Sequence, residues 1–185
     1  LYKQIVSETA AFLKREMSDG NGKYYSAIDA DSEGEEGKFY VWTKDELRSI
    51  TFPPISNNKQ QELIFDYFNI NERGYWEKDN YLPLRHADNS KLAKKYDLTT
   101  EEFETYIKDV KLKLLSVRDH RIRPGLDQKM ITSWNALMVT ALCNAYQALG
   151  DSLYLDEAIR CMNNISLNSY NSSGNLLHVE SKKGK

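Results

Sequence analysis

The longest hydrophobic pattern in the chain runs from Met130 to Gly150, a stretch without a charged residue in a sequence that is 28% charged. A helix that is apolar on most of its faces either is buried or spans a membrane. Polar residues interrupt this one too often for a bilayer, so we expect an inner helix wrapped by other helices. Its apolar positions are Ile131, Trp134, Leu137, Met138, Val139, Ala141, Leu142, Cys143, Ala145 and Leu149.

Shorter amphipathic stretches predict further helices, because their apolar residues recur every three or four positions. We expect these helices over Tyr2–Met17, Thr43–Ile50, Asn58–Phe68, Thr99–Arg121 and Tyr154–Tyr170. Two of them begin with Thr and carry Glu three residues later, the capping box that satisfies N–H groups of the first turn. The chain is therefore expected to be mainly α-helical.

Short strands are expected on both sides of an acidic loop. Tyr24–Asp31 and Lys38–Trp42 are rich in aromatic and aliphatic residues and flank the loop Ser32–Gly37. Such a pair of stretches predicts a β-hairpin. Farther along the chain, Gly74–Leu84 is expected to be a loop rich in aromatic residues.

The end of the chain repeats a pattern from its beginning. The turn and strand Asp19–Ser26 follow the first predicted helix, and the similar segment Ser172–His178 follows the last one. In both, a polar turn with Gly and Asn leads into bulky residues. Recurring helix–turn–strand units indicate an array of helical hairpins with short strands at one rim.

The composition limits the partners and the compartment. Twenty-five basic and 27 acidic residues give a net charge of −2, so nucleic acid and anionic membranes are not expected partners. Cys143 and Cys161 fall in helical patterns without a CxxC spacing, as reduced thiols of a cytoplasmic protein do. The sequence contains no signal peptide or transmembrane pattern. We therefore expect a cytoplasmic protein.

We expect no metal ion and no cofactor. Asp29–Gly34 resembles the start of a calcium-binding loop, but Tyr40 occupies the twelfth place, where a bidentate Glu is required. His86, His120 and His178 share no ligand spacing with each other or with the cysteines.

Asp29 and Asp31 are the first candidates for chemistry. Residues two apart in an extended segment point to the same face, and these two carboxylates stand among Tyr, Ile and Ala. Paired carboxylates transfer protons or bind sugar hydroxyls. The alternative is a solvated acidic turn, which describes Glu33, Glu35 and Glu36 equally well.

Arg123, Asp127 and Lys129 immediately precede the uncharged helix. A helix N-terminus favours anions, and neighbouring basic residues strengthen that preference. The alternative is a structural Arg–Asp pair that braces the loop. Trp134 offers a stacking face and Asn135 a hydrogen-bonding amide, although core packing alone would explain Trp134.

Several ordered blocks of the chain resemble one family, the spermatogenesis-associated, thioredoxin-domain-containing proteins. The blocks are Tyr25–Gly34, Gly37–Thr43, Gly74–Trp76, Arg118 with Arg121–Pro124, and Leu126–Met138. The resemblance implies a thioredoxin-like domain, which is absent here, followed by a six-hairpin α/α toroid related to N-acylglucosamine 2-epimerases and toroidal glycoside hydrolases. Residues 1–185 would form a single domain, about half of that six-hairpin glycosidase-like toroid. Gly125 departs from the family, which often has His there, and Ala136 stands where Gly is usual.

The resemblance implies a carbohydrate-processing function of the epimerase or glycosidase type. Asp29, Asp31 and Asp127 would be its catalytic groups. The substrate, a carbohydrate or sugar phosphate, would contact Tyr25, Trp42, Arg123, Lys129, Trp134 and Asn135. The alternative is a non-catalytic binding or scaffold module that works with the thioredoxin-like domain. A partial toroid leaves apolar flanks exposed, so self-association is also expected.

Overall fold

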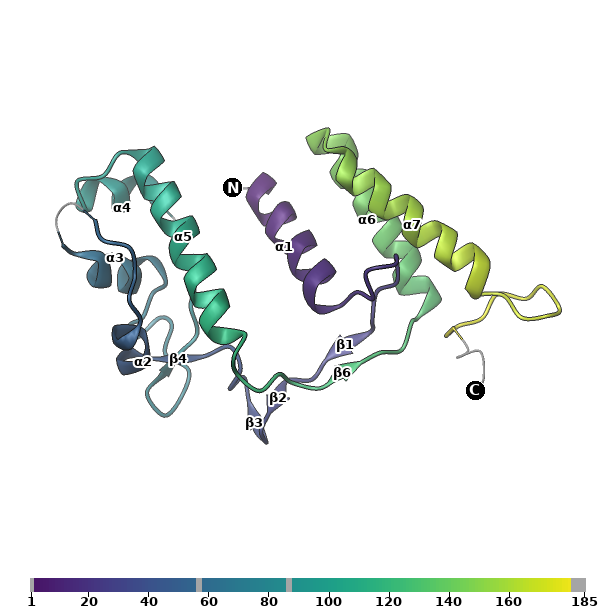
Figure 1. Cartoon of the computed structure of the whole chain (residues 1–185), viewed down its shortest axis with the longest axis horizontal. Helices are drawn as coiled ribbons and strands as arrows, with labels where there is room; N and C mark the ends of the chain where they lie inside the picture. The colour runs from purple at the N-terminus through teal and green to yellow at the C-terminus, as the bar shows by residue number, and fades with distance from the viewer. Residues whose placement is uncertain (1, 56–57, 86–87, 181–185) are drawn as a thin grey trace. The chain divides into compact units, whose positions relative to one another are not determined.

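The computed structural model describes residues 2–55, 58–85 and 88–180. They divide into two compact units. The first unit joins the residues up to Asp29 with those from Gly125 onward, and the second unit is Ala30–Pro124. Each is described by itself below (Figure 1).

The first unit contains three helices and one pair of short strands. The helices are α1 (Tyr2–Glu16), α6 (Thr132–Leu149) and α7 (Ser152–Asn168), and the strands are β1 (Ala27–Ile28) and β6 (Leu126–Asp127). Helices α6 and α7 run side by side in Figure 1. Gly150, in the left-handed conformation with φ 72°, ends α6, and the Asp151 side chain caps α7. The small core of this unit consists of Tyr24, Leu142, Tyr154, Ala158 and Cys161.

The second unit holds the larger core. Its helices are α2 (Lys44–Ser49), α3 (Gln60–Tyr67), α4 (Asn89–Lys95) and α5 (Thr100–Arg118). Its strands are β2 (Asp31–Ser32), β3 (Glu35–Glu36), β4 (Trp42–Thr43) and β5 (Asn80–Tyr81). Buried side chains of α3 and α5, with aromatic residues from neighbouring segments, form the centre of this core: Leu63, Ile64, Tyr67, Phe103, Ile107, Val110, Trp42 and Tyr96.

The mainly helical fold is confirmed, and all six helices expected from the sequence are present with small shifts at their ends. Thr99 and Glu102 form the complete capping box. Thr43 accepts from the N–H of Glu46 as expected, but the Glu46 carboxylate bonds with Arg121 instead. Helix α4 was not predicted. It is short, and its capping residue Asp88 is the main local signal for it.

The predicted hairpin between Tyr24–Asp31 and Lys38–Trp42 is wrong. Strand β1 pairs with β6, β2 pairs with β3, and β4 pairs with β5, all antiparallel. The acidic loop closes on itself because Glu33 and Gly34 both adopt positive φ (55° and 77°), which produces a tight two-residue turn between β2 and β3. Two of the three pairings therefore join segments far apart in the sequence.

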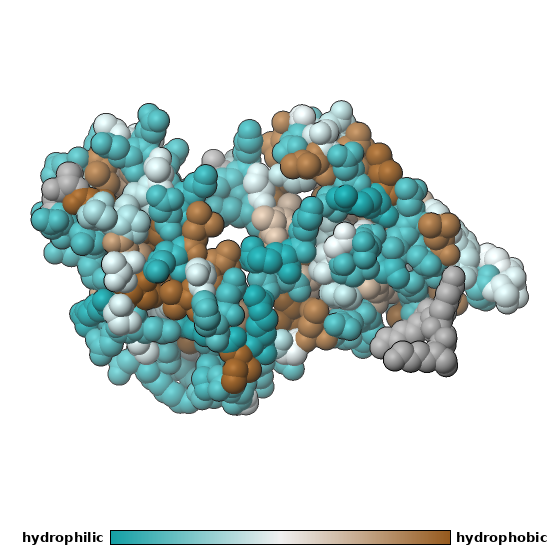
Figure 2. Space-filling view, in the orientation of Figure 1, coloured by the Kyte–Doolittle hydropathy of each residue, from teal (hydrophilic) through white to brown (hydrophobic). Residues whose placement is uncertain are grey.

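The expectation that other helices wrap α6 is wrong for the described part of the chain. Only Thr132, Asn135 and Leu142 of this helix are buried, whereas Leu137 is 68% and Trp134 is 54% exposed. Figure 2 shows apolar surface over the α6–α7 hairpin. The apolar stripe is wide, but the neighbouring helices of this unit cover only one side of it. No helix within the described residues is long and apolar enough to cross a membrane.

The predicted repeat is confirmed in its hydrogen bonds. We call Met17–Tyr25 the first turn and Ser169–Leu177 the second turn. In each, the N–H of the last residue donates to the C=O of the first, at 2.8 Å and 2.7 Å respectively. The side chains of Asp19 and Asn171 each accept from the N–H groups two and four residues further on. The two turns therefore have the same local structure.

Candidate functional site

Arg121, three residues beyond the end of α5, organises one wall of the second unit. Its Nη1 donates to the carbonyl oxygens of Phe39 at 2.9 Å and Val41 at 2.8 Å. Its Nη2 bonds with the Glu46 carboxylate at 2.5 Å, and its guanidinium stacks over the Trp42 ring, 4.0 Å from the centroid. The planar guanidinium thus fixes the segment between β3 and β4 through several bonds at once.

A cavity of about 440 Å³ opens beside this network, within the second unit. Its volume lies in the range of small-molecule sites. Its walls come from the β2–β3 hairpin, the segment leading to β4, the Trp76 loop and the residues after α5. The lining residues are Ser32, Glu33, Glu35, Glu36, Lys38, Phe39, Val41, Glu46, Trp76, Glu77, Asn80, His120, Arg121 and Ile122.

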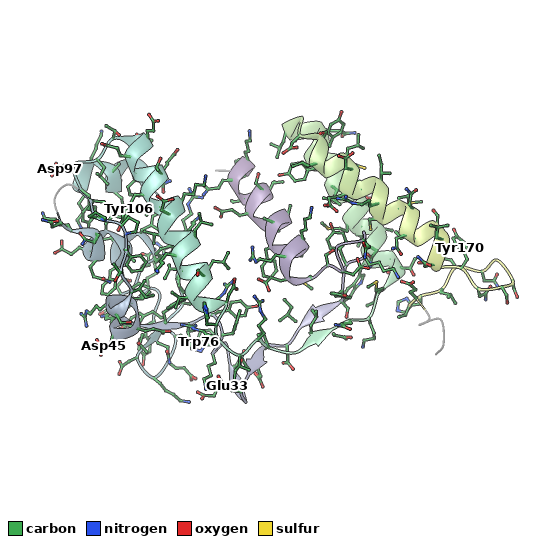
Figure 3. All side chains as sticks on the ribbon, viewed as in Figure 1. Glu33, Asp45, Trp76, Asp97, Tyr106 and Tyr170 are labelled. Carbon is green, nitrogen blue, oxygen red and sulfur yellow. The ribbon has the colours of Figure 1, made fainter. Side chains whose placement is uncertain are left out.

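Trp76 stands at this cavity with its indole 43% exposed (Figure 3). The backbone N–H of Trp76 donates to the Asn80 carbonyl at 2.9 Å, so the loop is closed by the same segment that forms β5. Gly37, with φ 73°, presents its open side to the ring, at 3.7 Å from where a Cβ would stand. Gly74 lies so close to the Asn69 carbonyl that a Cβ there would be 2.2 Å away. Gly74 therefore allows the close backbone approach within this loop, and Gly37 lies in van der Waals range of the indole.

The charged groups of the cavity are mostly carboxylates, and the cations are engaged. Lys38 Nζ lies 3.3 Å from Glu33 and 3.4 Å from Glu35. The hydrogen bond with Glu33 is the main reason that the pKa of Lys38 is raised above its usual value. Arg121 is held by Glu46 and the two carbonyl groups. An anionic ligand would have to displace one of these pairs.

The predicted residues of the second unit have different surroundings. Trp42 is only 3% exposed and lies beneath the Arg121 guanidinium, so its ring supports the wall of the cavity. Arg123 pairs with Asp119 at 2.8 Å, which is the structural Arg–Asp pair considered above, although with a different Asp. Asp31 is exposed in β2, opposite Glu36.

In the first unit, Asp127 and Lys129 are brought together. Lys129 Nζ lies 2.9 Å from the Asp127 carboxylate, and the Lys129 N–H donates to the same group at 3.2 Å. These bonds, the side-chain one first, lower the pKa of Asp127. Tyr25 is half-buried, and its N–H completes the first turn.

We expect the Lys129→Met substitution to raise the pKa of Asp127 toward its ordinary value of 3.8, but not fully, because the backbone bond remains. A carboxyl whose pKa is depressed by folding stabilises the fold above its unfolded-state pKa, and this contribution is lost as pH falls through the folded value. An NMR titration of the side-chain carboxyl carbon measures the change. An Asp127 pKa that is equal in both proteins would contradict the pairing.

Asp29 lies at the end of the β1–β6 pair, where its N–H donates to the Gly125 carbonyl at 2.7 Å. A Cβ added at Gly125 would stand 3.7 Å from the Asp29 Cβ and 3.8 Å from its carboxylate. A side chain at position 125 would therefore be in van der Waals contact with Asp29.

Trp134 and Asn135 differ in their exposure to solvent. Trp134 is 54% exposed at the start of α6, as a stacking residue must be. Asn135 is 5% exposed, and its amide bonds with both backbone groups of Tyr24, accepting from its N–H at 2.9 Å and donating to its C=O at 3.0 Å. The Asn135 amide therefore fastens the first turn to α6.

Sequence reasoning missed Arg121, Trp76 and His120 as a group. Trp76 and Arg121 lie in blocks that resemble the family, so the sequence did carry a signal for them. Only the fold, however, brings their distant segments to one cavity. The ring Nδ1 of His120 lies 2.8 Å from the Ser116 carbonyl. His178 contributes a backbone carbonyl that accepts from Thr132, and His86 lies outside the described residues. Within the ranges that the structure covers, no cluster of three or more His, Cys, Asp or Glu could hold a metal ion.

No family model matches the chain. It is 29% identical over 176 residues to uncharacterized protein B0495.5 of Caenorhabditis elegans, covering 86% of this chain and 24% of that protein. It is 27% identical over 177 residues to spermatogenesis-associated protein 20 of Homo sapiens, covering 85% and 22%. The chain is a distant homologue of these proteins. The protein of Mus musculus is 28% identical over 169 residues, covering 80% and 21%.

The similarity to spermatogenesis-associated protein 20 confirms the resemblance at the level of distant homology. The chain spans about a quarter of the length of the curated relatives it matches. The names of these relatives state neither a substrate nor a reaction.

Proposed function

We propose that the cavity of the second unit binds a carbohydrate. The observation that carries this proposal is the half-exposed indole of Trp76, which lines the same cavity as the carboxylates of Glu33 and Glu77 and the amide of Asn80. A sugar has C–H faces that pack on an aromatic ring and hydroxyl groups that donate to carboxylate and amide oxygens. An open cavity that offers both kinds of group suits such a ligand.

The resemblance to the spermatogenesis-associated family supports this proposal. Phe39, Trp76 and Arg121 come from three separate blocks of that resemblance, and all three line the cavity. The family's toroid is related to enzymes that act on carbohydrates. The matching first and second turns are consistent with a toroid built from repeated helical hairpins, which we propose as the architecture to which the chain belongs.

The charges favour a neutral or amine-bearing sugar over a sugar phosphate. Among the described residues that line the cavity, the Lys and the Arg are already bonded to carboxylates: Lys38 to Glu33 and Glu35, and Arg121 to Glu46. A phosphate would lie among the remaining carboxylates, and such like-charge contacts are unfavourable. The catalytic assignment of Asp29, Asp31 and Asp127 stays a separate prediction.

Binding is tested by thermal denaturation of the chain with glucose, glucosamine, N-acetylglucosamine and glucose 6-phosphate. A ligand at 100 times its dissociation constant adds about 2.7 kcal/mol of stability. We expect stabilisation by at least one of the first three sugars, and its loss in the Trp76→Leu variant.

Trp134→Leu is the matched control, because Trp134 is the other exposed tryptophan and lies in the first unit. We expect this variant to keep the stabilisation. Loss of binding in Trp134→Leu alone would contradict the cavity and move the site to the start of α6. No stabilisation by any sugar would contradict the carbohydrate proposal and favour a non-catalytic scaffold.

A further inference from the structure

The two matching turns differ in what covers them. The first turn is covered by α7. A Cβ added at Gly22 would stand 2.7 Å from the backbone carbonyl of Arg160, so turn and helix approach each other backbone to backbone. The Asn164 side chain lies 3.5 Å from the Asn21 carbonyl, and Tyr24 is only 8% exposed. The first turn therefore packs against α7.

Helix α6 completes the contact with the first turn. Tyr24 follows the Gly of the turn by two residues, and its N–H and C=O both bond with the amide of Asn135. The Asn135 amide thus makes the two hydrogen bonds that a neighbouring β-strand would otherwise make with the backbone of Tyr24. The α6–α7 hairpin thus holds the first turn with one amide from α6 and one close backbone approach from α7.

The second turn presents the same groups without a cover. Gly174 occupies the place of Gly22, with φ 78°, and a Cβ there would meet nothing within 4 Å. Leu176 occupies the place of Tyr24 and is 58% exposed. Among the described residues nothing bonds with the N–H and C=O of Leu176. Tyr170, two residues beyond the end of α7 and labelled in Figure 3, is 51% exposed.

We propose that the second turn is the docking site for a further helical hairpin of the α6–α7 kind, carried by the same polypeptide beyond these residues. One helix of this hairpin supplies an amide side chain to the backbone of Leu176, and the other packs its backbone against Gly174. The α6–α7 hairpin of a second copy does not fit, because its own first turn already occupies the corresponding face. The relatives have room for such a hairpin, since the matched stretch is 21–24% of their length.

Amide hydrogen exchange of the chain and of the full-length product of its gene tests the proposal. In the chain alone, we expect the Leu176 amide to exchange fast and the Tyr24 amide slowly. In the longer polypeptide, the Leu176 amide should slow by roughly 100-fold, because exchange then requires the docked hairpin to open. A Leu176 amide that stays fast in the longer polypeptide would overturn the proposal, as would a gene product that ends with these residues.

Three glycines provide a second, matched test. Gly20 and Gly174 have the same φ of 78° and open space around them, whereas Gly22 faces a backbone. In the chain alone, Gly20→Asn and Gly174→Asn should lower the melting temperature by the same small amount, and Gly22→Asn by more. In the longer polypeptide, Gly174→Asn should become as damaging as Gly22→Asn. If it still matches Gly20→Asn there, no backbone packs against Gly174 and the proposal fails.

Discussion

Replacing Arg121 with Met is expected to destabilise the chain by about 3 kcal/mol, because it leaves partly buried groups without their partner. The carbonyl oxygens of Phe39 and Val41 would lose their donor, and the carboxylate of Glu46 its cation. The aromatic face of Trp42 would lose the guanidinium that covers it. The free energy of unfolding in urea measures this loss. A thermal-shift measurement should also show weaker sugar binding, since the same residues form the cavity wall.

Two further variants separate the causes. Arg121→Lys keeps the charge but not the planar guanidinium, so it should recover only part of the lost stability. Arg48→Met removes another Arg of this unit, whose ion pair with Asp45 is exposed (57% and 92% for the two side chains). Exposed pairs contribute about 0.2–1 kcal/mol. Equal stability of Arg121→Met, Arg121→Lys and Arg48→Met would show that the bonds of Arg121 do not stabilise this unit.

Asn135→Ala is expected to destabilise the first unit by about 3 kcal/mol, since it leaves the N–H and the C=O of buried Tyr24 unsatisfied. Both groups bond only with this amide in the described structure. Ala is the better helix former, so helix propensity acts in the opposite direction by about 0.5 kcal/mol. Urea denaturation measures the net change in the free energy of unfolding. Faster hydrogen exchange of the Tyr24 amide would show that the loss arises at this contact.

Asn144→Ala is the control for this prediction. It makes the same substitution in the same helix, at an exposed position. The variant should therefore be as stable as the parent or more stable by a few tenths of a kcal/mol. A loss of stability at Asn144 equal to that at Asn135 would mean that the effect belongs to the helix and not to the contact with Tyr24.

The local parts of this fold could be predicted from the sequence. Thr99 and Glu102 mark the start of α5, and Gly150 marks the end of α6, because these signals act within a few residues. The likeness of the two turns was also visible, since the same Gly and Asn chemistry closes both. Short strands could be expected too, although not their partners.

The pairing of the strands and the site could not be predicted in the same way. Trp42 pairs with Tyr81 and Ala27 pairs with Asp127, choices that depend on long-range packing. Asn135 was expected to contact substrate, but its amide binds a backbone segment more than 100 positions earlier. The sequence does not show that Arg121 and Trp76 line the same cavity, because this depends on the fold. The carboxylates at Asp29, Asp31 and Asp127 remain predicted catalytic groups.

The division of the chain into these two units also predicts an order of folding. The second unit is continuous in sequence, from Ala30 to Pro124, so its contacts can form while the rest of the chain is still unfolded. The first unit is discontinuous, and the bond from Asp29 to Gly125 closes a loop that contains the whole second unit. Closing such a loop costs less entropy once its interior is already compact. We therefore expect the second unit to fold first, and α1 to pack only after α6 and α7 have been synthesised.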